Sequence, residues 1–440
     1  MDEKRCYIKT FGCQMNEQDT VRLTQLLGRD GYRPTEDPEQ ADVILVITCS
    51  IREKAENKVY SLLGRFQPLK REHPGLVIGV GGCVAQQEGE RLLQKASYLD
   101  LVFGTHNVHK VPALLAEIRR HGGRLAETRF YDEIPTDGLF DADGRLKAYV
   151  TIMQGCDYRC SFCVVPFTRG PEVSRRSDDV LAEVRALAAG GTKEVTLLGQ
   201  TVNSYGKKAP GELTLTRLLE AIEAVDGIER IRFTTSHPND LTDELIGAFG
   251  RLSKLCEHLH LPVQAGSDRV LAHMRRPYTR DAYLDKVRGL RTRCPEIALS
   301  ADLIIGFPGE TDEDFGQTLD LLRQVRYDSL FAFRYSRRPN TDAAELPDQV
   351  PDELKAARHQ ALLDLQRGIA EERARAQLGT VQEVLVEGPS PGDALKLTGR
   401  TRTNRIVHFP GPPHLIGHLA RVRITQALAH SLTGEWVPSA

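Results

Sequence analysis

The feature that most constrains the fold of this chain is an alternation of strand-like and helix-like segments. From residue 148 to 336 it passes through strand-like stretches that read "AYVTIMQ", "EVTLLGQ", "RIRFTTS", "HLHLPVQ", "LSADLIIGF" and "SLFAFRYS". Helical segments such as "SDDVLAEVRALAAG" and "TDEDFGQTLDLLRQV" lie between them. A closed (β/α) barrel has eight such units. The pattern therefore predicts a (β/α)6 partial TIM barrel over 148–378, including a trailing helix, open on one side to a large substrate.

A different pattern lies on each side of this barrel. Residues 1–120 place the apolar stretches "CYIKTFG", "ADVILVIT" and "LVIGVGG" between amphipathic helices, which predicts a doubly wound α/β domain with a parallel sheet. Residues 121–147 are polar and rich in turn formers, and we interpret them as a linker. Residues 379–440 read as short strands punctuated by Gly and Pro, which predicts a small β-barrel. The whole chain is expected to be a multidomain α/β protein.

Composition and charge narrow the class of protein. The chain of 440 residues is 40% hydrophobic and 27% charged, like ordinary globular proteins, and its apolar runs are too short to span a bilayer. The start "MDEKRCYIKTFG" does not resemble a signal peptide. We therefore expect a cytoplasmic protein with reduced cysteines and no membrane partner. Basic residues outnumber acidic ones from Ala394 onward and between Arg275 and Arg293. Such regions either bind a polyanion such as RNA or are solvated faces of the protein.

Three cysteines are clustered in "CDYRCSFC", directly after the first barrel strand. Functional groups of β/α barrels lie at the carboxyl ends of the strands. The thiolates of Cys156, Cys160 and Cys163 are suitable ligands for three irons of a four-iron cluster, leaving one iron open for a cofactor or substrate. The alternative is a zinc site completed by a distant histidine, with His237 and His260 as candidates.

A second set of cysteines is dispersed in the N-terminal domain. Cys13, Cys49 and Cys83 each follow an apolar strand, and the carboxyl ends of parallel strands meet at one edge of a sheet. The three thiols could therefore converge on a ligand. Gly12 and the glycines at 79, 81 and 82 would let the backbone approach a bulky cluster closely. The alternative is that each cysteine is a small buried hydrophobe.

Several longer motifs together resemble a known family. They are "TFGCQMNEQD", "ITCSIREKAENKVYSLLGR", "GGCVAQ", "MQGCDYRCSFCVVPFTRG", "LLGQTVNSYG", "HLPVQAGSDRVL", "DLIIGFPGET" and "GRTRTNRIVHF". These motifs are similar to those of the methylthiotransferases, a subgroup of radical S-adenosylmethionine (SAM) enzymes. "GCQMN" and "GQTVNSY" resemble the members that act on dimethylallyladenosine in tRNA. The resemblance runs from about residue 6 to 435, and its last part is similar to the RNA-binding TRAM domain.

The resemblance implies an enzyme, a transferase that adds a methylthio group to carbon 2 of N(6)-dimethylallyladenosine beside the tRNA anticodon. In this family Cys156, Cys160 and Cys163 would hold a radical SAM 4Fe-4S cluster, whose open iron binds SAM. Cys13, Cys49 and Cys83 would hold an auxiliary 4Fe-4S cluster that supplies sulfur. A radical made from SAM would remove hydrogen from carbon 2 before methylthio transfer. Two other functions stay open: methylthiolation of a ribosomal protein aspartate, and non-catalytic, zinc-dependent RNA binding.

The resemblance also implies partners and further site residues. Partners would be a tRNA anticodon stem-loop and an electron donor such as a flavodoxin or ferredoxin, and we expect a monomer. Residues expected to contact SAM are Phe162, Gln200, Asn203, Ser236, Gln264, Asp302 and Gly306, with Glu310 nearby. Residues expected to contact RNA phosphates are Arg400, Arg402 and Arg405. The alternative roles are capping and barrel packing for the former, and a charged β-loop for the latter.

Overall fold

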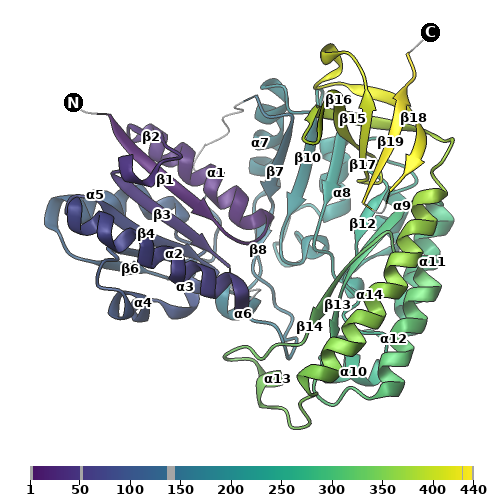
Figure 1. The fold of residues 1–440 in the computed structure, drawn as a ribbon, viewed down its shortest axis with the longest axis horizontal. Coiled ribbons are helices and arrows are strands. Elements are labelled where there is room, and N and C mark those ends of the chain that lie inside the picture. The colour runs from purple at the N-terminus through teal and green to yellow at the C-terminus, as the bar shows by residue number, and fades with distance from the viewer. Residues whose placement is uncertain (1–2, 50–52, 136–143, 429, 439–440) are drawn as a thin grey trace.

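The computed structural model describes residues 3–49, 53–135, 144–428 and 430–438. It contains an N-terminal α/β domain, a central open barrel and a small C-terminal β-barrel (Figure 1). The predicted multidomain fold is confirmed. Within the described residues, the helices are too short or too polar to cross a lipid bilayer.

The N-terminal domain is a parallel sheet covered by helices on both faces. Its strand order is β2-β1-β3-β4-β5-β6. The strands are β1 (Lys4–Thr10), β2 (Tyr32–Pro34), β3 (Val43–Thr48), β4 (Val77–Gly82), β5 (Leu101–Phe103) and β6 (Leu125–Glu127). The helices are α1 (Gln14–Arg29), α2 (Glu53–Glu72), α3 (Cys83–Glu88), α4 (Glu90–Lys95) and α5 (Val111–His121). Alternate residues of β3 enter two separate cores, one under α1 and α5 and the other under α2 and α3.

The sixth strand of this sheet differs from the sequence-based prediction. β6 lies within the polar segment 121–147, which we interpreted as a linker, and it pairs in parallel with β5. Its residues are only partly buried because β6 is an edge strand. The hydrophobic pattern of a buried strand is therefore missing, and the sequence could not reveal it.

The central domain is an open barrel of six parallel strands, as predicted. They are β7 (Lys147–Thr151), β10 (Glu194–Leu198), β11 (Arg230–Phe233), β12 (His258–His260), β13 (Ala298–Ile305) and β14 (Ser329–Arg334). They form two three-stranded sheets, which a parallel bridge between Ile231 and Leu255 joins. The covering helices are α7 (Ser177–Ala189), α8 (Leu215–Glu223), α9 (Asp243–Ala248), α10 (Asp268–His273), α11 (Arg280–Arg293), α12 (Asp312–Val325) and α14 (Asp352–Arg375).

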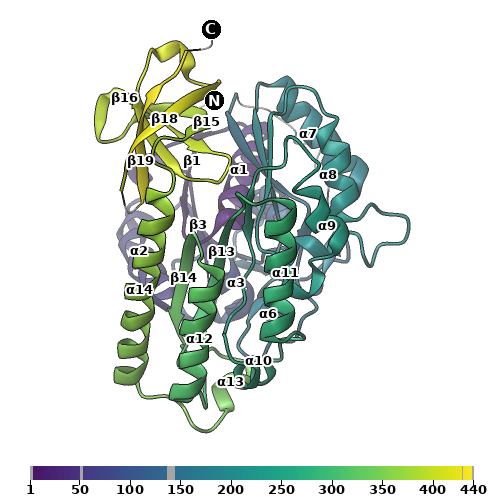
Figure 2. The same ribbon diagram turned by 90° about the vertical axis from the view of Figure 1, so that its right-hand side faces the viewer.

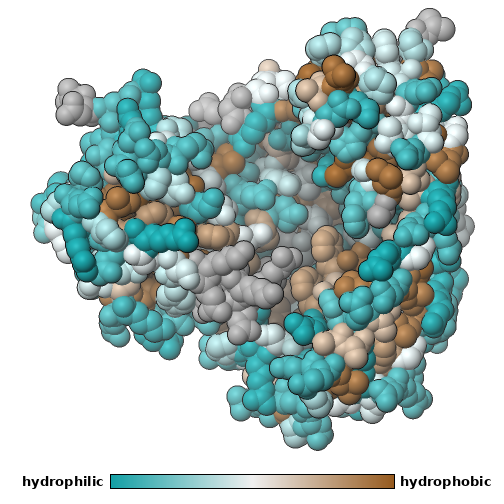
Figure 3. Space-filling view, in the orientation of Figure 1, coloured by the Kyte–Doolittle hydropathy of each residue, from teal (hydrophilic) through white to brown (hydrophobic). Residues whose placement is uncertain are grey.

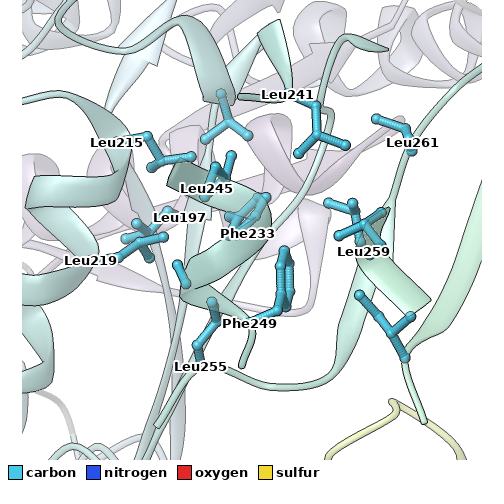
Figure 4. Close-up of a cluster of buried hydrophobic side chains, with 14 of the residues drawn as sticks. Leu197, Leu215, Leu219, Phe233, Leu241, Leu245, Phe249, Leu255, Leu259 and Leu261 are labelled. Carbon is cyan, nitrogen blue, oxygen red and sulfur yellow. The ribbon is translucent and has the colours of Figure 1, made fainter. Parts of the chain in front are cut away.

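The largest core of the molecule lies between these strands and their helices. Figure 4 shows part of it, in which Leu197 and Phe233 of the strands meet Leu219 of α8 and Leu245 of α9. Burying side chains of this size stabilises the fold by roughly 1.5–3 kcal/mol each. The strands are therefore held firmly, and their carboxyl ends form a fixed platform for the loops that follow.

Short elements lie at the carboxyl ends of the barrel strands, and a second, smaller barrel lies at the other end of the central domain. The platform carries β8 (Met153–Gln154), β9 (Val173–Ser174), α6 (Val165–Thr168) and α13 (Asp342–Glu345). The C-terminal domain is a closed five-stranded barrel of β15 (Val381–Ser390), β16 (Asp393–Thr401), β17 (Ile406–Pro410), β18 (Leu419–Ala427) and β19 (Ser431–Trp436). Figure 2 shows this domain at the end of α14, away from α6, α10 and α13.

Candidate functional site

The first cysteine site, which comprises Cys156, Cys160 and Cys163, lies on one loop at the carboxyl ends of the barrel strands. Gly155 starts this loop with φ +77°, and a Cβ there would lie 1.8 Å from the carbonyl oxygen of Pro171. The loop closes on itself, because the Cys156 N–H donates to the Gly170 carbonyl over 3.1 Å. It is also held from outside, since the Ser161 N–H donates to the Met274 carbonyl at the end of α10. The positions of the three thiols are thus set by local backbone and by one neighbouring helix.

Polar groups reach two of these thiols. Thr201, after β10, places its hydroxyl 3.2 Å from the Cys156 sulfur, and Arg276 donates from Nη1 to the Cys160 sulfur over 3.4 Å. Burial raises the pKa of Cys156, and burial together with the nearby Cys160 raises the pKa of Cys163 to about 12. A buried thiolate is stable only beside positive charge, and a bound metal centre provides it. Cys156 and Cys163 are therefore better suited to be ligands of a metal cluster than to be free thiolates.

The second cysteine site, Cys13, Cys49 and Cys83, is assembled from three neighbouring strands. These residues directly follow or soon follow β1, β3 and β4, which are paired side by side in parallel. The sheet order reverses between β1 and β3, the place where doubly wound proteins bind ligands. Because adjacent strands lie about 5 Å apart, the three strand ends span about 10 Å. The predicted convergence on one edge of the sheet is confirmed, and the role of these residues as ligands stays a prediction.

Two fully buried polar side chains join the three strand ends. Asn16 donates from Nδ2 to the carbonyls of Phe11 and Thr48, at 2.6 and 3.0 Å. The Thr48 hydroxyl donates to the Gly81 carbonyl over 2.6 Å and accepts from the Val84 N–H over 3.2 Å. Each strand end is thereby bonded to the next, which fixes the spacing of the three cysteines.

The glycines of this region have two different tasks. Gly12 has φ +126°, and a Cβ there would lie 2.6 Å from the Cβ of Cys49, so its absence brings β1 and β3 together beside the thiols. At Gly81 a Cβ would instead lie 2.3 Å from the ring of Phe103, and at Gly79 it would meet Leu45. We predicted that these glycines of β4 make room for a cluster, and this was wrong: Gly79 and Gly81 make room for core side chains of the sheet.

The two cysteine sites face each other across the domain boundary. α3, which starts at Cys83, packs against α6, which starts just after Cys163 (Figure 1). The Thr105 hydroxyl donates to the Thr168 carbonyl over 2.8 Å, and the His106 ring lies 2.9 Å from the Arg169 carbonyl. Figure 3 shows the molecule hollowed between the N-terminal domain and the barrel. Both cysteine sites therefore lie on elements that contact each other at this boundary.

The histidines considered for a zinc site have other partners. His237 stacks on Tyr158 with ring centroids 3.7 Å apart, and His260 lies 3.0 Å from Ser300 and 3.4 Å from Asp302. Within the parts of the chain that the structure describes, no three His, Cys, Asp or Glu side chains converge as ligands of one metal ion. A cubane cluster takes its thiolates at separate iron corners rather than at one ion, so both sets of three cysteines remain candidates for such a cluster.

The structure places the residues expected to contact SAM in two groups. Gln200 and Ser236 lie beside the first cysteine site: Gln200 accepts from the Gly155 N–H over 2.6 Å, and the buried Ser236 hydroxyl lacks a partner among the described residues. Asn203 is used structurally, because its amide bonds both backbone groups of His237. The Gly306 N–H donates to Glu310, which Arg358 in turn binds at 2.9 Å. Contact of any of them with SAM stays a prediction.

The remaining expected contacts are Phe162, which lies within the loop of the first cysteine site, and Gln264 and Asp302, which lie elsewhere in the barrel. Phe162 packs against a small core under α10. Gln264 has a left-handed backbone with φ +75° and pairs in parallel with Leu303. Asp302 points to the inner face of β13, beside His260.

A polar cluster beside the first cysteine site was not predicted. Tyr158, within "CDYRCSFC", donates its hydroxyl to Asp240 over 2.8 Å, and Lys207 bonds the other oxygen of Asp240 at 2.6 Å. Burial, together with the charges of Arg276 and Lys207, lowers the pKa of His237 to about 2, so this histidine is neutral. Its Nε2 is buried without a partner among the described residues, and so is Oε1 of Glu172 nearby. Unpartnered polar atoms at a strand end favour a bound polar ligand.

An exposed aromatic residue on the inner face of the barrel was also missed. Phe331 of β14 pairs with Asp302 of β13, so both side chains point to the same face, and Phe331 meets the His260 ring edge-on at 5.9 Å. Alternate residues of β13, such as Leu303, point to the opposite face and the helix-covered core. Phe331 is half exposed although it lies inside the barrel. The edge strand β14 has no fully buried residue, so its sequence does not indicate which of its two faces lines the interior of the barrel.

The three arginines expected to contact RNA lie between the β-barrel and the central barrel. Arg402 binds both oxygens of Glu257 at 2.7 and 2.8 Å, and Arg405 binds Asp328 at 2.6 Å. Arg400 bonds the carbonyl of Asn404 in its own loop over 3.2 Å. Their contact with phosphate stays a prediction, and the observed contacts give Arg402 and Arg405 a role in holding two domains together.

Arginines of the central barrel complete this interface. The fully buried Arg230 donates to the Arg400 carbonyl at 2.7 Å and pairs with Glu383 at 3.0 Å, and Arg232 donates to the carbonyls of Thr401 and Arg402. Arg230 is the first residue of β11, and Glu257 and Asp328 directly precede β12 and β14. The small barrel is therefore seated on the amino ends of the strands, opposite both cysteine sites.

Comparison with known protein families agrees with this three-part architecture. Residues 5–104 match the uncharacterized protein family UPF0004, residues 150–322 match the radical SAM superfamily and residues 375–437 match the TRAM domain. The first cysteine site lies in the second of these regions and the second site in the first. The fold and the site thus define a radical SAM protein with an additional cysteine-bearing domain and a TRAM domain.

Comparison with curated proteins gives the particular family. The chain is 53% identical to tRNA-2-methylthio-N(6)-dimethylallyladenosine synthase of Geobacter metallireducens, over 98% of both chains. It is 50% identical to the protein of the same name from Syntrophus aciditrophicus, over 99% of this chain and 95% of the relative. This chain belongs to the tRNA-2-methylthio-N(6)-dimethylallyladenosine synthase family.

Solved structures support the fold at greater distance. The radical S-adenosylmethionine methyltransferase TsrM from Kitasatospora setae, solved with cobalamin and a [4Fe-4S] cluster, has a TM-score of 0.57 at 15% identity. The match covers 78% of this chain and 74% of TsrM. The radical enzyme OxsB, with aqua-cobalamin and S-adenosylmethionine bound, has a TM-score of 0.51 at 13% identity, over 84% of this chain and 56% of OxsB. At these identities the likeness concerns the fold alone.

Proposed function

We propose that this protein is a tRNA-modifying transferase that adds a methylthio group to carbon 2 of N(6)-dimethylallyladenosine beside the anticodon. The observation that carries this proposal is the pair of three-cysteine sites that face each other between α3 and α6. One site suits the production of a radical and the other suits a store of sulfur. The family to which the chain belongs bears the name of this reaction.

The thiols of this chain fit two 4Fe-4S clusters. Cys156, Cys160 and Cys163 would hold the cluster that binds SAM, and Cys13, Cys49 and Cys83 would hold an auxiliary one. When bound, the first cluster would pass one electron to SAM and so support radical chemistry, and the second would supply the sulfur to be transferred. The buried thiols of the first site bind metal with release of protons, because burial keeps Cys156 and Cys163 protonated in its absence.

The side chains around the first site are suited to orient a cofactor with amino, carboxylate and nucleoside parts. Ser236, His237 and Glu172 offer buried polar atoms that lack partners among the described residues. The neutral His237, stacked on Tyr158, accepts the Asn239 N–H at Nδ1, so its proton is on Nε2, which can donate one hydrogen bond to a ligand. Arg276 keeps positive charge against Cys160 and does not titrate near neutral pH. These groups would fix the orientation of the bound cofactor, and none of them needs to act as a general base.

The inner face of the barrel is suited to an extruded base. Loop bases of RNA are recognised by being splayed out and stacked on aromatic side chains. Phe331 offers such a ring at the open edge of the barrel, with Asp302 and His260 beside it. The TRAM domain would hold the RNA itself, and its exposed basic residues Arg421 and Arg423 on β18 are available for phosphate. An anticodon stem-loop would then reach the cysteine sites through the open side.

The proposal is tested by analysing tRNA nucleosides from a strain in which the gene is deleted. We expect methylthio-dimethylallyladenosine to disappear and its precursor to accumulate, and the complemented strain to recover it. Unchanged methylthio-adenosine levels with a changed ribosomal protein mass would contradict this assignment in favour of aspartate methylthiolation. Anaerobically reconstituted protein is expected to hold about eight irons. One zinc and no iron would instead indicate a non-catalytic RNA-binding protein.

The proposal includes partners for the reaction. A flavodoxin or ferredoxin would deliver electrons, since the reductive cleavage of SAM consumes them. We expect a monomer in the cytoplasm. Size-exclusion chromatography with light scattering and reduction assays with purified donors test these two points.

A further inference from the structure

Arg169 belongs to the central barrel, but its side chain is buried in the N-terminal domain. It follows α6 and so lies shortly after the first cysteine site in sequence. Only 3% of the residue is exposed. Its Nη2 donates to Asn16 Oδ1 over 2.9 Å and pairs with Asp19 Oδ2 at 3.5 Å. Its Nη1 is equally buried and has no hydrogen-bond partner among the residues that the structure describes.

The surroundings of this guanidinium are the thiols of the second cysteine site. Burial alone would lower the pKa of Arg169, but the charges of Cys83, Asp19 and Cys13 raise it above the ordinary value. Asn16, which bonds Nη2, is the residue that joins the ends of β1 and β3 beside Cys49. The guanidinium is therefore permanently charged and lies against the same strand ends that carry the thiols.

The backbone of Arg169 is fixed as firmly as its side chain. Its N–H donates to the Val165 carbonyl over 2.8 Å, and its carbonyl lies 2.9 Å from the His106 ring. The next carbonyl, of Gly170, accepts from the Cys156 N–H and so closes the loop of the first cysteine site. Arg169 thus follows the loop of one cysteine site in the chain, and its side chain is bonded to Asn16 beside the other.

A buried N–H without a partner is destabilising, and more so in a charged group. This destabilisation is offset when a ligand supplies the acceptor. The group expected at the second cysteine site consists of a cluster, its three thiolates and any sulfur bound to it. Such a group accepts hydrogen bonds through sulfur and carries negative charge.

We propose that Arg169 is a positioning residue that donates a hydrogen bond from Nη1 to the sulfur-rich group held by Cys13, Cys49 and Cys83. This inference rests on the proposed function, because it requires an iron–sulfur cluster at the second cysteine site. It assigns to Arg169 the task of holding that group in a fixed position relative to the first site. Asp19 weakens the electrostatic influence of Arg169 on that group, because its carboxylate balances part of the charge on the guanidinium.

The proposal predicts opposite effects for the two partners of the ion pair. Hydrogen bonds and positive charge near a cluster favour its reduced, more negative state. Arg169→Gln should therefore lower the reduction potential of the auxiliary cluster. Asp19→Asn leaves the positive charge unbalanced and should raise the potential. A merely structural role in domain docking would disturb the cluster in the same direction in both variants.

The test uses the full chain in which Cys156, Cys160 and Cys163 are all replaced by alanine, so that only the second site can hold iron. The protein is reconstituted anaerobically, and the cluster is titrated at pH 8 by electron paramagnetic resonance. Arg169→Gln is expected to lower the reduced-to-oxidised ratio about tenfold at the parent midpoint, a shift of about 59 mV for one electron. Arg169→Lys, which keeps the charge, should fall between Gln and the parent.

A matched control is available at the other site. Arg276 is also a buried arginine beside a cysteine, Cys160, so Arg276→Gln should leave the auxiliary potential unchanged. Opposite shifts in Arg169→Gln and Asp19→Asn, with iron content retained, support the proposal. Retained iron with equal or absent shifts overturns the role of Arg169 alone. A parent protein that binds no iron overturns this inference together with the second cluster of the proposed function.

Discussion

The two ends of the central barrel use the same residue type for different tasks. At the carboxyl ends of the strands, Arg276 donates to the Cys160 sulfur, and Arg169 pairs with Asp19 and is also under the influence of the Cys83 and Cys13 thiols. At the amino ends, Arg230, Arg402 and Arg405 lie against carboxylates and backbone carbonyls of the neighbouring domain. If the proposed function is right, a buried arginine beside a thiol serves the reaction, whereas one that binds only carboxylates and carbonyls of another domain serves assembly. We therefore expect changes at the carboxyl ends to abolish chemistry and changes at the amino ends to weaken the fold.

The largest expected effect comes from removing thiols at the carboxyl ends. Replacing Cys156, Cys160 and Cys163 together by alanine should abolish methylthiolation and leave about four of eight irons, because the second site is built by another domain. Iron analysis and tRNA nucleoside mass spectrometry measure both outcomes. Replacing Cys13, Cys49 and Cys83 serves as the reciprocal variant, with the same loss of activity and about four irons on the first site. Loss of all iron in either variant would show that the sites are not independent.

The next largest effect is expected at Gly12, which tests how the second site is assembled. Alanine at this position would force a Cβ to within 2.6 Å of the Cβ of Cys49, at a φ of +126°. We expect loss of the auxiliary irons with the first cluster retained. Gly31→Ala is the matched control, because Gly31 also has a left-handed backbone, φ +81°, but open space around it. It should cost about 1–2 kcal/mol of stability without loss of iron. Equal iron loss in both variants would contradict the close-contact argument.

Substitutions on the inner face of the barrel should reduce activity less than removal of the thiols does. Phe331→Leu keeps an apolar side chain but removes the ring, and stacking of one base contributes about 1–3 kcal/mol. We expect kcat/KM for tRNA to fall roughly tenfold, with cluster content unchanged. Phe331→Trp retains a ring for stacking and should keep most of the activity. If the leucine and tryptophan variants behave alike, Phe331 does not stack on the substrate.

Substitutions at the amino ends of the strands should lower the stability of the protein rather than its catalytic activity. Arg402→Gln leaves both oxygens of Glu257 without their charged partner, which we expect to lower the free energy of unfolding by about 1–3 kcal/mol. Chemical denaturation of the iron-free proteins measures this change. The exposed Arg423 on β18 provides the control, and Arg423→Gln should stay within about 0.5 kcal/mol of the parent. A stable Arg402 variant that loses RNA affinity would instead support the predicted phosphate contact.

The smallest effect is expected on the outer face of the TRAM domain. Replacing Arg421 and Arg423 by glutamine should weaken tRNA binding severalfold, and should reduce the slope of log Kd against log salt by about 1–2. Filter binding at several salt concentrations measures the slope. Glu435 lies opposite Arg423 on the next strand, so Glu435→Gln should change the affinity in the opposite direction. An unchanged slope in the arginine variant would place the RNA on another face.

Sequence alone predicted the carboxyl ends of the strands better than the amino ends. The first cysteine site is local, so its spacing could be read directly, and the second could be inferred because strand ends of a parallel sheet share one edge. Arg169 could not be assigned, because its partners Asn16 and Asp19 are remote in sequence. For the same reason Arg402 was predicted to contact RNA, although it contacts Glu257. A basic residue in sequence reveals its charge and not its partner.

The seat of the TRAM domain on the amino ends of the strands has a consequence for the choice of substrate. β13 has eight residues, so about 26 Å of strand separates the two ends of the barrel. On a flexible tether, an RNA-binding module would raise the local concentration of any nearby base. Because Arg230, Arg402 and Arg405 hold this module against the barrel, it would instead present to the site only a base at a set distance from the RNA backbone that it binds. Selection among adenosines would then depend on the length of the stem as much as on the identity of the base.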